Sequence, residues 1–156
     1  MALLDAQPEP KPHFRVDRVL REQCVGDAEG HSFLFERVPQ KSLEDHFRDR
    51  QYPILFDRTQ RFPNGESSND VAARAERAIN DLVLKPYLPR AISGSNDVHV
   101  AVVSHGVCIS ELIPVLLKRD NGGVPPSNYR HLLNTAWTRI TVQVKVTSCV
   151  AWLVLS

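Results

Sequence analysis

The stretch VHVAVVSHGVCISELIPVLLKR, from Val98 to Arg119, decides the fold of this chain. Its first half is a run of apolar and mostly β-branched residues that ends at Ser104-His105-Gly106, which is typical of a buried strand. Its second half repeats apolar residues at helical spacing, at positions 109, 112, 113, 116 and 117. The pattern predicts a strand over residues 98–103, a tight turn, and a helix that ends at the breaker Asn121-Gly122-Gly123.

The predicted junction between this strand and this helix is a candidate anion site. In open α/β sheets, ligands bind at the carboxyl edge of the strands, where this turn would lie. The backbone N–H groups of Gly106, Val107 and Cys108 would be unpaired donors at a helix N-terminus, and such donors favour an anion such as phosphate. His105 at the strand tip could add a positive charge or a proton relay. A histidine hydrogen-bonded within an ordinary turn is the structural alternative.

Length and charge narrow the function class. With 156 residues the chain is long enough for one ordinary domain. Lys plus Arg number 19 and Asp plus Glu number 18, so the net charge of +1 creates no global field toward nucleic acid or an anionic membrane. The most basic stretch, residues 46–61, is interrupted by Asp49 and Asp57 and is typical of a solvated, salt-bridged surface. We therefore predict no nucleic-acid partner and no membrane partner.

Cysteine and histidine usage indicates a reducing compartment and no metal. The three cysteines, Cys24, Cys108 and Cys149, are widely separated and form no C-x-x-C pair. The six histidines show no H-x-H or H-E-x-x-H grouping, so we expect neither a metal site nor a cofactor. The opening residues MALLDAQPEPKP lack the pattern of a targeting signal, and no stretch has the length of a membrane span. These features predict a soluble, cytoplasmic protein.

The N-terminal part predicts a lead-in followed by a strand. Residues 1–13 carry prolines at positions 8, 10 and 12 and little that could pack, so we expect a flexible lead-in before a domain over residues 14–156. Alternating apolar residues from Phe14 predict a strand that ends near Leu20, with Glu22 just past its end.

Two further regions have a recognisable pattern. The irregular stretch from Gly26 to Glu66 is typical of a functional cap or lid, and it contains one short helical patch, residues 41–50, with Ser42 as its expected N-cap. Near the C-terminus, residues 136–146 alternate apolar and polar side chains and residues 150–155 are apolar, which predicts two strands of an antiparallel hairpin.

The clearest helix lies in the middle of the chain. Apolar residues recur at helical spacing from Val71 to Val83. Ser67 and Asp70 stand in a capping-box-like arrangement before it, and Pro86 is expected to stop it. Together with the strand and helix around Ser104-His105-Gly106, this pattern predicts an α/β fold.

Three segments carry a resemblance to a known family. They are LREQCVGDAEG (residues 20–30), FPNGESSNDVAAR (residues 62–74) and VVSHGVCISELI (residues 102–113). In this order and at these separations they resemble the histidine phosphatase superfamily, the phosphoglycerate mutase-like proteins, over residues 14–155. The resemblance implies a mostly parallel sheet with flanking helices and a C-terminal antiparallel hairpin. It also implies phosphomonoester hydrolysis or mutase-type transfer through a phosphohistidine, without a metal.

The resemblance also implies roles for individual residues. His105 matches the family's second histidine, which helps to hold the phosphoryl charge, and Glu22 matches the glutamate that protonates the leaving oxygen. Cationic side chains and helix-end amides suit the negative charge of a phosphoryl transition state, and an alkoxide leaving group needs a proton. We therefore expect Glu22 and His105 to be catalytic, and the amides of Gly106 and Val107 to bind phosphate.

One part of the family pattern has no match in this chain. The sequence contains no R-H-G, so the nucleophilic histidine of the family has no counterpart, and the arginine-bearing segment S-x-x-x-R-A-x-x-T-A is also missing. We expect an N-terminally shortened family member, incomplete at its start, with phosphatase activity absent or severely reduced. A non-catalytic phosphate-binding or scaffold module is the alternative. Loss of a neighbouring strand would expose the edge of residues 98–103, so we also expect self-association.

Two other enzyme classes fit less well. The run V-V-S-H-G differs from the G-x-S-x-G nucleophile elbow of serine hydrolases by Val102 in place of the first glycine, although Asp120 and His131 follow in the hydrolase order. Cys108 lacks the arginine of a C-x5-R phosphatase loop, because Pro114 stands six residues later. Cys108 is expected to pack as a small apolar residue near the helix start.

Overall fold

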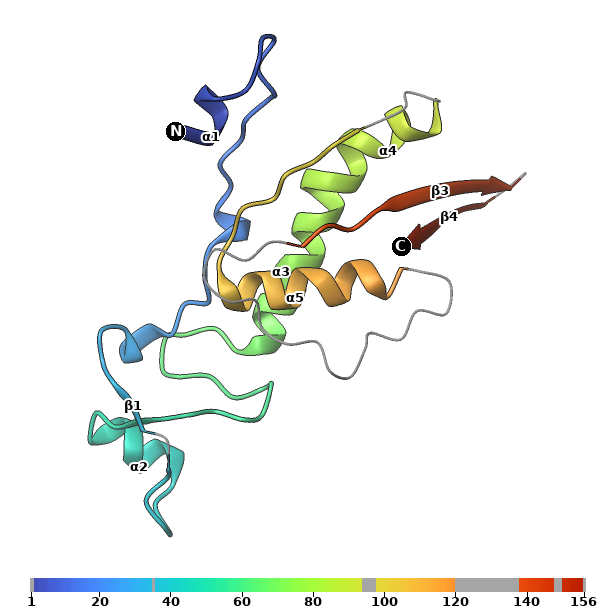
Figure 1. Cartoon of the computed structure of the whole chain (residues 1–156). Coiled ribbons are helices and arrows are strands. Elements are labelled where there is room, and N and C mark those ends of the chain that lie inside the picture. Colours follow the sequence, from blue (N-terminus) through green and yellow to red (C-terminus); the bar gives the residue numbers. More distant parts are fainter. Residues whose placement is uncertain (1, 35, 94–97, 120–137, 148–149, 156) are drawn as a thin grey trace.

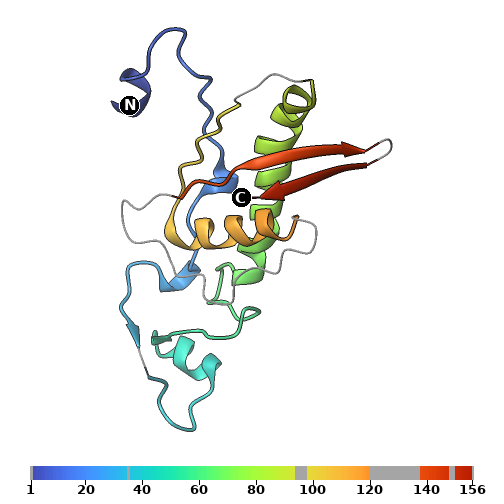
Figure 2. The same cartoon turned by 45° about the vertical axis from the view of Figure 1, so that its right-hand side comes forward.

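The computed structural model describes residues 2–34, 36–93, 98–119, 138–147 and 150–155. Two helices form its centre, α3 (Ser68–Ala78) and α5 (Gly106–Leu117), with α5 lying across α3 (Figures 1 and 2). The core between them consists of buried residues from both helices and from the segment that follows α3, namely Ala75, Ala78, Ile79, Cys108 and Leu112. Partly buried Val19 and Leu20 pack against this core, so the segment before Glu22 is attached to it.

Helix α3 begins where the sequence predicts. Ser67 is its N-cap, its hydroxyl accepts the Asp70 N–H at 3.2 Å, and the Asp70 carboxylate accepts the Ser67 N–H at 2.8 Å. This reciprocal capping box satisfies two N–H groups that a helix start leaves unpaired. Val71, Ala75 and Ala78 are buried at helical spacing, so both the predicted cap and the predicted apolar face are confirmed.

The predicted stop at Pro86 is wrong. α3 continues into a π-helical segment, η3 (Ile79–Leu84), and then into α4 (Lys85–Ile92), which contains the proline. A proline breaks a helix because it lacks an N–H and its ring crowds the preceding turn. Here the Lys85 N–H donates five residues back to the Asn80 carbonyl, and Pro86 falls in the first turn of α4, where proline is tolerated.

Helix α5 is confirmed, whereas the strand predicted before it is wrong. Residues 98–103 run as an extended segment into α5 (Figure 1) and pair with no strand among the described residues. Val100 and Val102 are about 40% exposed, at 39% and 40%, and Val103 is 78% exposed. A strand exists only through hydrogen bonds to a neighbour, and the part of the chain that the structure describes supplies none here. The predicted breaker 121–123 lies outside the described residues.

The strand predicted from Phe14 to Leu20 is also wrong. This segment ends in a short 3₁₀ turn, η1 (Arg18–Leu20), whose N-cap Asp17 accepts the Val19 N–H at 3.1 Å. Phe14 and Val16 are exposed. A side-chain cap of this kind offers the backbone an alternative to a sheet ladder. The lead-in begins with one helical turn, α1 (Ala2–Asp5).

The predicted cap region folds around its own small core. Short helices η2 (Gly26–Ala28) and α2 (Leu43–Arg48) accompany two strands, β1 (Phe33–Leu34) and β2 (Tyr52–Pro53), which pair in parallel. Buried Ala28, Tyr52 and Phe62 form the core, and the Tyr52 and Phe62 rings meet edge to face with centroids 5.7 Å apart. Ser42 caps α2 through the Asp45 N–H, as predicted.

Gly26 fixes how the cap region returns to α3. Its φ of +58° lies in the left-handed region, and a Cβ at this position would come within 2.1 Å of the Pro63 carbonyl oxygen. Only glycine fits a backbone that approaches another segment so closely. The Asp27 N–H donates to the same Pro63 carbonyl at 3.0 Å. This contact joins the LREQCVGD segment to the loop that carries Glu66.

Sheet content is small in the described residues. Besides the parallel pair β1–β2, strands β3 (Val142–Thr147) and β4 (Val150–Leu155) pair antiparallel, and β3 runs beside α4. Residues 148–149, which connect β3 and β4, lie outside the described residues. The described residues thus form two separate two-stranded sheets, where the sequence predicts one mostly parallel sheet.

Candidate functional site

The structure brings Glu22 to the first turn of α5. One carboxylate oxygen of Glu22, Oε2, accepts the Val107 N–H at 3.4 Å, and the other, Oε1, accepts the Cys108 N–H at 3.3 Å. Oε1 also accepts the N–H of the adjacent Gln23 at 2.9 Å. Glu22 and Val107 are 85 residues apart in the sequence, so this contact is tertiary. The negative carboxylate therefore faces the positive end of the α5 dipole.

His105 lies directly beside this contact. It is the N-cap of α5 with an extended backbone, and its side chain does not cap the helix. The residue is exposed, and its imidazole has no hydrogen-bond partner among the described residues. The neighbouring Ser104 hydroxyl donates to the Leu20 carbonyl at 2.7 Å, which fastens the His105 turn to the segment that carries Glu22. An exposed imidazole thus belongs to the N-cap residue of the helix whose first-turn amides contact Glu22.

The Glu22 carboxylate occupies the position where a phosphate would accept hydrogen bonds from the same backbone N–H groups. Helix-start N–H groups bind an anion because they are unpaired and because the dipole adds partial positive charge. In this structure the chain's own carboxylate fills that role for Val107 and Cys108. Binding of phosphate to these amides therefore requires the carboxylate to move away or to be neutralised.

A buried arginine holds the segment that carries Glu22. Arg74 on α3 is only 2% exposed. Its Nη1 donates to the Val19 and Arg21 carbonyls at 2.9 and 2.8 Å, and its Nη2 donates to the Glu22 carbonyl at 3.1 Å. Nη1 also lies 3.4 Å from the Sγ of the buried Cys108. Arg74 thus contacts both the Glu22 segment and the first turn of α5. Cys108 is fully buried, so the prediction that it packs inside is confirmed.

Glu66 neutralises this arginine. Its carboxylate accepts from Nε and Nη2 of Arg74 at 3.1 and 3.3 Å, from the Arg21 guanidinium at 2.6 Å, and from the Cys24 N–H at 3.0 Å. Burial alone would raise the pKa of the Glu66 carboxyl, but the Cys24 N–H and the Arg74 and Arg21 guanidinium groups outweigh it and lower the pKa below its ordinary value. The carboxylate is therefore ionised at neutral pH, as its arginine partners require.

The predicted site residues lie together, and two residues were missed. Glu22, His105, Gly106 and Val107 all lie at the start of α5, although their chemical roles stay predictions. The sequence patterns led to no prediction of the contact between Glu66 and Arg74. The signal was present, because both belong to the segment FPNGESSNDVAAR that carries the resemblance, and Arg74 falls between apolar positions on the buried face of α3.

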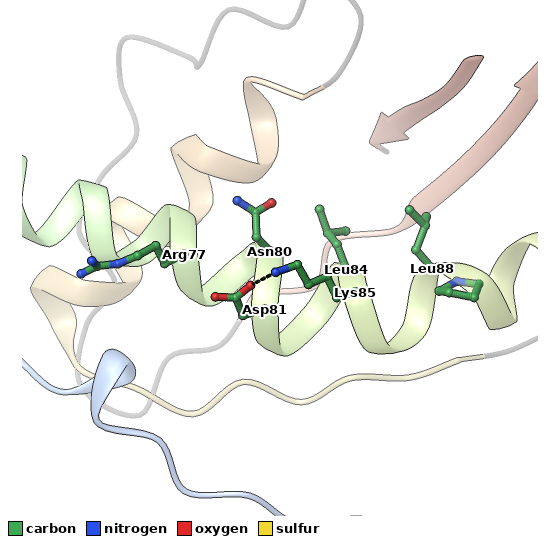
Figure 3. A pocket seen from close by; sticks show the side chains of 7 residues that line it. Arg77, Asn80, Asp81, Leu84, Lys85 and Leu88 are labelled. Carbon is green, nitrogen blue, oxygen red and sulfur yellow. Dashed lines mark hydrogen bonds and ion pairs between the residues drawn. The ribbon is translucent and has the colours of Figure 1, made fainter. Parts of the chain in front are cut away.

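The described residues also form two grooves, the second of which borders the candidate site through Arg21 and Arg74. An open groove of about 450 Å³ runs along α3, η3 and α4, where Asp81 and Lys85 form an ion pair (Figure 3). A second groove of about 310 Å³ is lined mainly by arginines, among them Arg18 and Arg77. Neither groove includes Glu22 or His105.

Within the described ranges no three His, Cys, Asp or Glu side chains are grouped so that they could hold a metal ion.

Two features of the serine-hydrolase alternative fall outside the structure. Asp120 and His131 are not among the described residues, and the Ser104 hydroxyl donates a hydrogen bond to the Leu20 carbonyl.

No helix in the described part of the chain is long and apolar enough to cross a membrane.

One comparison with known proteins identifies a family for this chain. The chain matches the model of the histidine phosphatase superfamily (branch 1) over residues 4–154. No curated protein and no solved structure matches the chain. The match covers nearly all of the sequence and includes the three segments that contribute Glu22, Arg74 and His105. The chain therefore belongs to the histidine phosphatase superfamily.

Proposed function

We propose that this chain binds phosphate and small phosphomonoesters at the start of α5, and that it transfers the phosphoryl group poorly or not at all. The observation that carries this proposal is the Glu22 carboxylate on the Val107 and Cys108 amides, with the exposed His105 beside it. A site that already holds one anion through backbone N–H groups has the donors that a phosphate oxygen needs.

The chemistry of the site suits a phosphoryl group. A protonated His105 supplies a positive charge, and the Gly106, Val107 and Cys108 amides supply donors at the positive end of α5. Once displaced from these amides and protonated, the Glu22 carboxyl group could donate its proton to an alkoxide leaving group. These are the electrostatic and acid parts of a phosphatase site, and membership of the superfamily supports their use in that way.

The attacking part of such a site has no counterpart in the sequence. No histidine of the chain stands in an R-H-G motif. His31 lies in the N-terminal half of the chain, but its ring packs at a tilt against Tyr52 of the cap region, with the ring centroids 5.0 Å apart. A covalent phosphohistidine requires a nucleophile aligned with the phosphorus, and holding the phosphate alone does not supply one.

Binding is tested by equilibrium titration with inorganic phosphate and with a simple phosphomonoester. We expect weak, saturable binding by the wild-type chain. His105→Ala should weaken it, and Glu22→Gln should tighten it about fivefold, since a unit charge about 4 Å away is worth ~1 kcal/mol in water. Val103→Ala, just upstream and exposed, is the matched control and should leave the affinity unchanged. Absence of saturable binding in all variants would refute the proposed function.

Transfer is tested by incubation with a phosphomonoester labelled in its phosphoryl group. We expect no acid-labile phosphoprotein. Labelling that disappears in His105→Ala would show that the chain is an active phosphotransferase, and the binding-only part of the proposal would then be wrong. Binding without labelling favours the phosphate-binding module over the hydrolase.

A further inference from the structure

We infer that Arg74 is a positioning residue for the Glu22 site, holding the Glu22 carboxylate against the first turn of α5. This inference rests on the proposed function for its biological meaning. Its geometric content, that the place of Glu22 depends on Arg74, can be tested without phosphate.

The five N–H groups of the Arg74 guanidinium meet five oxygen acceptors. Nε and one N–H of Nη2 donate to the Glu66 carboxylate at 3.1 and 3.3 Å. The other N–H of Nη2 donates to the Glu22 carbonyl at 3.1 Å, and Nη1 donates to the Val19 and Arg21 carbonyls at 2.9 and 2.8 Å. A lysine has three donors on one point and lacks the planar fork, so it cannot reproduce this set.

Arg74 is the shared hydrogen-bond donor to three backbone carbonyls of the segment that carries Glu22. Val19 lies in η1, and the backbone from Arg21 to Val25 forms no helix or strand, so the Arg21 and Glu22 carbonyls have no ladder or helical partners. The Val19, Arg21 and Glu22 carbonyls all accept from one buried guanidinium. Without it they would be partly buried acceptors with no partner, which costs free energy and favours another path for the segment.

The other end of Arg74 is fixed relative to α5. Arg74 lies on α3 next to Ala75, which packs in the core with Cys108 and Leu112 of α5. Its Nη1 lies 3.4 Å from the Cys108 sulfur. The Cys108 N–H is also one of the two α5 groups that donate a hydrogen bond to the Glu22 carboxylate. One side chain therefore sets the Glu22 backbone at a defined place relative to the helix start.

A double-mutant cycle on the two amides tests the inference. Glu22→Gln replaces the charged carboxylate that contacts the Val107 and Cys108 N–H groups with a neutral amide, and it should therefore shift the ¹⁵N–¹H resonances of these two groups. In an Arg74→Lys background the same change should shift them by less than half as much, because Glu22 no longer rests on these amides. Arg77→Lys, on the same helix but exposed, is the matched control and should leave the full shift. An undiminished shift in Arg74→Lys would overturn the inference, since a merely structural contribution would add independently of Glu22.

Folding and function are kept apart in this design. Far-ultraviolet circular dichroism first establishes that each variant is folded. If Arg74→Lys is unfolded, Glu66→Gln takes its place, since it removes the charge that anchors the guanidinium fork. A reduced Glu22→Gln shift in Glu66→Gln then supports the inference, and an undiminished one overturns it. If no variant binds phosphate, the proposed function fails, whereas the amide cycle still decides the role of Arg74.

Discussion

The two segments that meet at the start of α5 differ sharply in how they are held. The segment carrying Glu22 is tied down by Arg74 and by the Ser104 hydroxyl, and its apolar residues Val19 and Leu20 pack against the core. Residues 98–103 run into the same place with exposed valines and no strand partner among the described residues. The Glu22 segment is held by side-chain contacts, whereas residues 98–103 are an extended segment that belongs to neither sheet of the described residues.

The difference shows what each kind of structure needs. A helix closes its own hydrogen bonds, and a cap or a buried arginine adds to it from nearby elements. A parallel strand gains its hydrogen bonds only from neighbours, and it is normally buried on both faces. The junction around Arg74 can therefore be complete while residues 98–103 pair with no strand in the part of the chain that the structure describes.

Removing Arg74 should destabilise the folded chain more than any other change considered below. Arg74→Ala leaves the Glu66 carboxylate and three carbonyls without their main partner, and loss of one member of a buried pair costs about 3 kcal/mol or more. We expect that loss in the free energy of unfolding from urea denaturation. Arg77→Ala, exposed on the same helix, should change it by no more than ~0.5 kcal/mol. Equal effects of the two changes would show that Arg74 is not a structural centre.

A smaller effect is expected at the start of α3. Ser67→Ala removes the hydroxyl that accepts the Asp70 N–H, and loss of such a cap costs about 1 kcal/mol. The neighbouring Ser68→Ala is the control, because Ser68 lies within the helix and offers no cap. Thermal or urea unfolding of the two variants gives the comparison. A Ser67→Ala variant as stable as Ser68→Ala would contradict the capping box.

Acid should weaken the contact between Glu66 and Arg74. The pKa of the Glu66 carboxyl is lowered in the folded chain, so the folded form binds fewer protons than the unfolded one. The stability from this shift is present above the ordinary glutamate pKa of about 4.3 and is lost as the pH falls through the lowered pKa. Urea midpoints measured below pH 5 should fall, and Glu66→Gln should flatten the fall. A wild-type curve of the same slope as Glu66→Gln would disprove this linkage.

The smallest effect on stability is expected in the extended segment. Val103 is 78% exposed, so Val103→Lys should change the free energy of unfolding by no more than ~0.5 kcal/mol. Because lysine on a free edge opposes edge-to-edge pairing, the same change should reduce self-association. Sedimentation velocity over a range of concentrations measures this, with Ala73→Lys, exposed on α3, as the control. A wild-type chain that sediments as a monomer at every concentration would remove the basis for self-association.

The sequence predicts the helices because their signals are local. Ser67, Asp70 and the apolar spacing from Val71 specify α3, and the turn at His105 followed by apolar spacing specifies α5. The stop expected at Pro86 fails because a π-helical turn places the proline in the first turn of a new helix, which no local pattern announces.

The strands and the buried pair needed information that no single segment holds. Residues 98–103 have the composition of a strand, but their pairing depends on partners elsewhere. The segment motifs placed Glu22 near His105 through the family resemblance, whereas the contact of Arg74 with three carbonyls is visible only in three dimensions. The place of Arg74 in the FPNGESSNDVAAR segment, between apolar positions on a helix face, is the feature of the sequence that could have indicated it.

Phosphate titration of the ¹⁵N-labelled chain tests the central claim most directly. Saturable shifts should appear first at the amides of Gly106, Val107 and Cys108, become weaker in His105→Ala, and occur at lower phosphate concentration in Glu22→Gln. Shifts that are absent from these three amides, or that centre on the arginine-lined groove around Arg18 and Arg77, would contradict it.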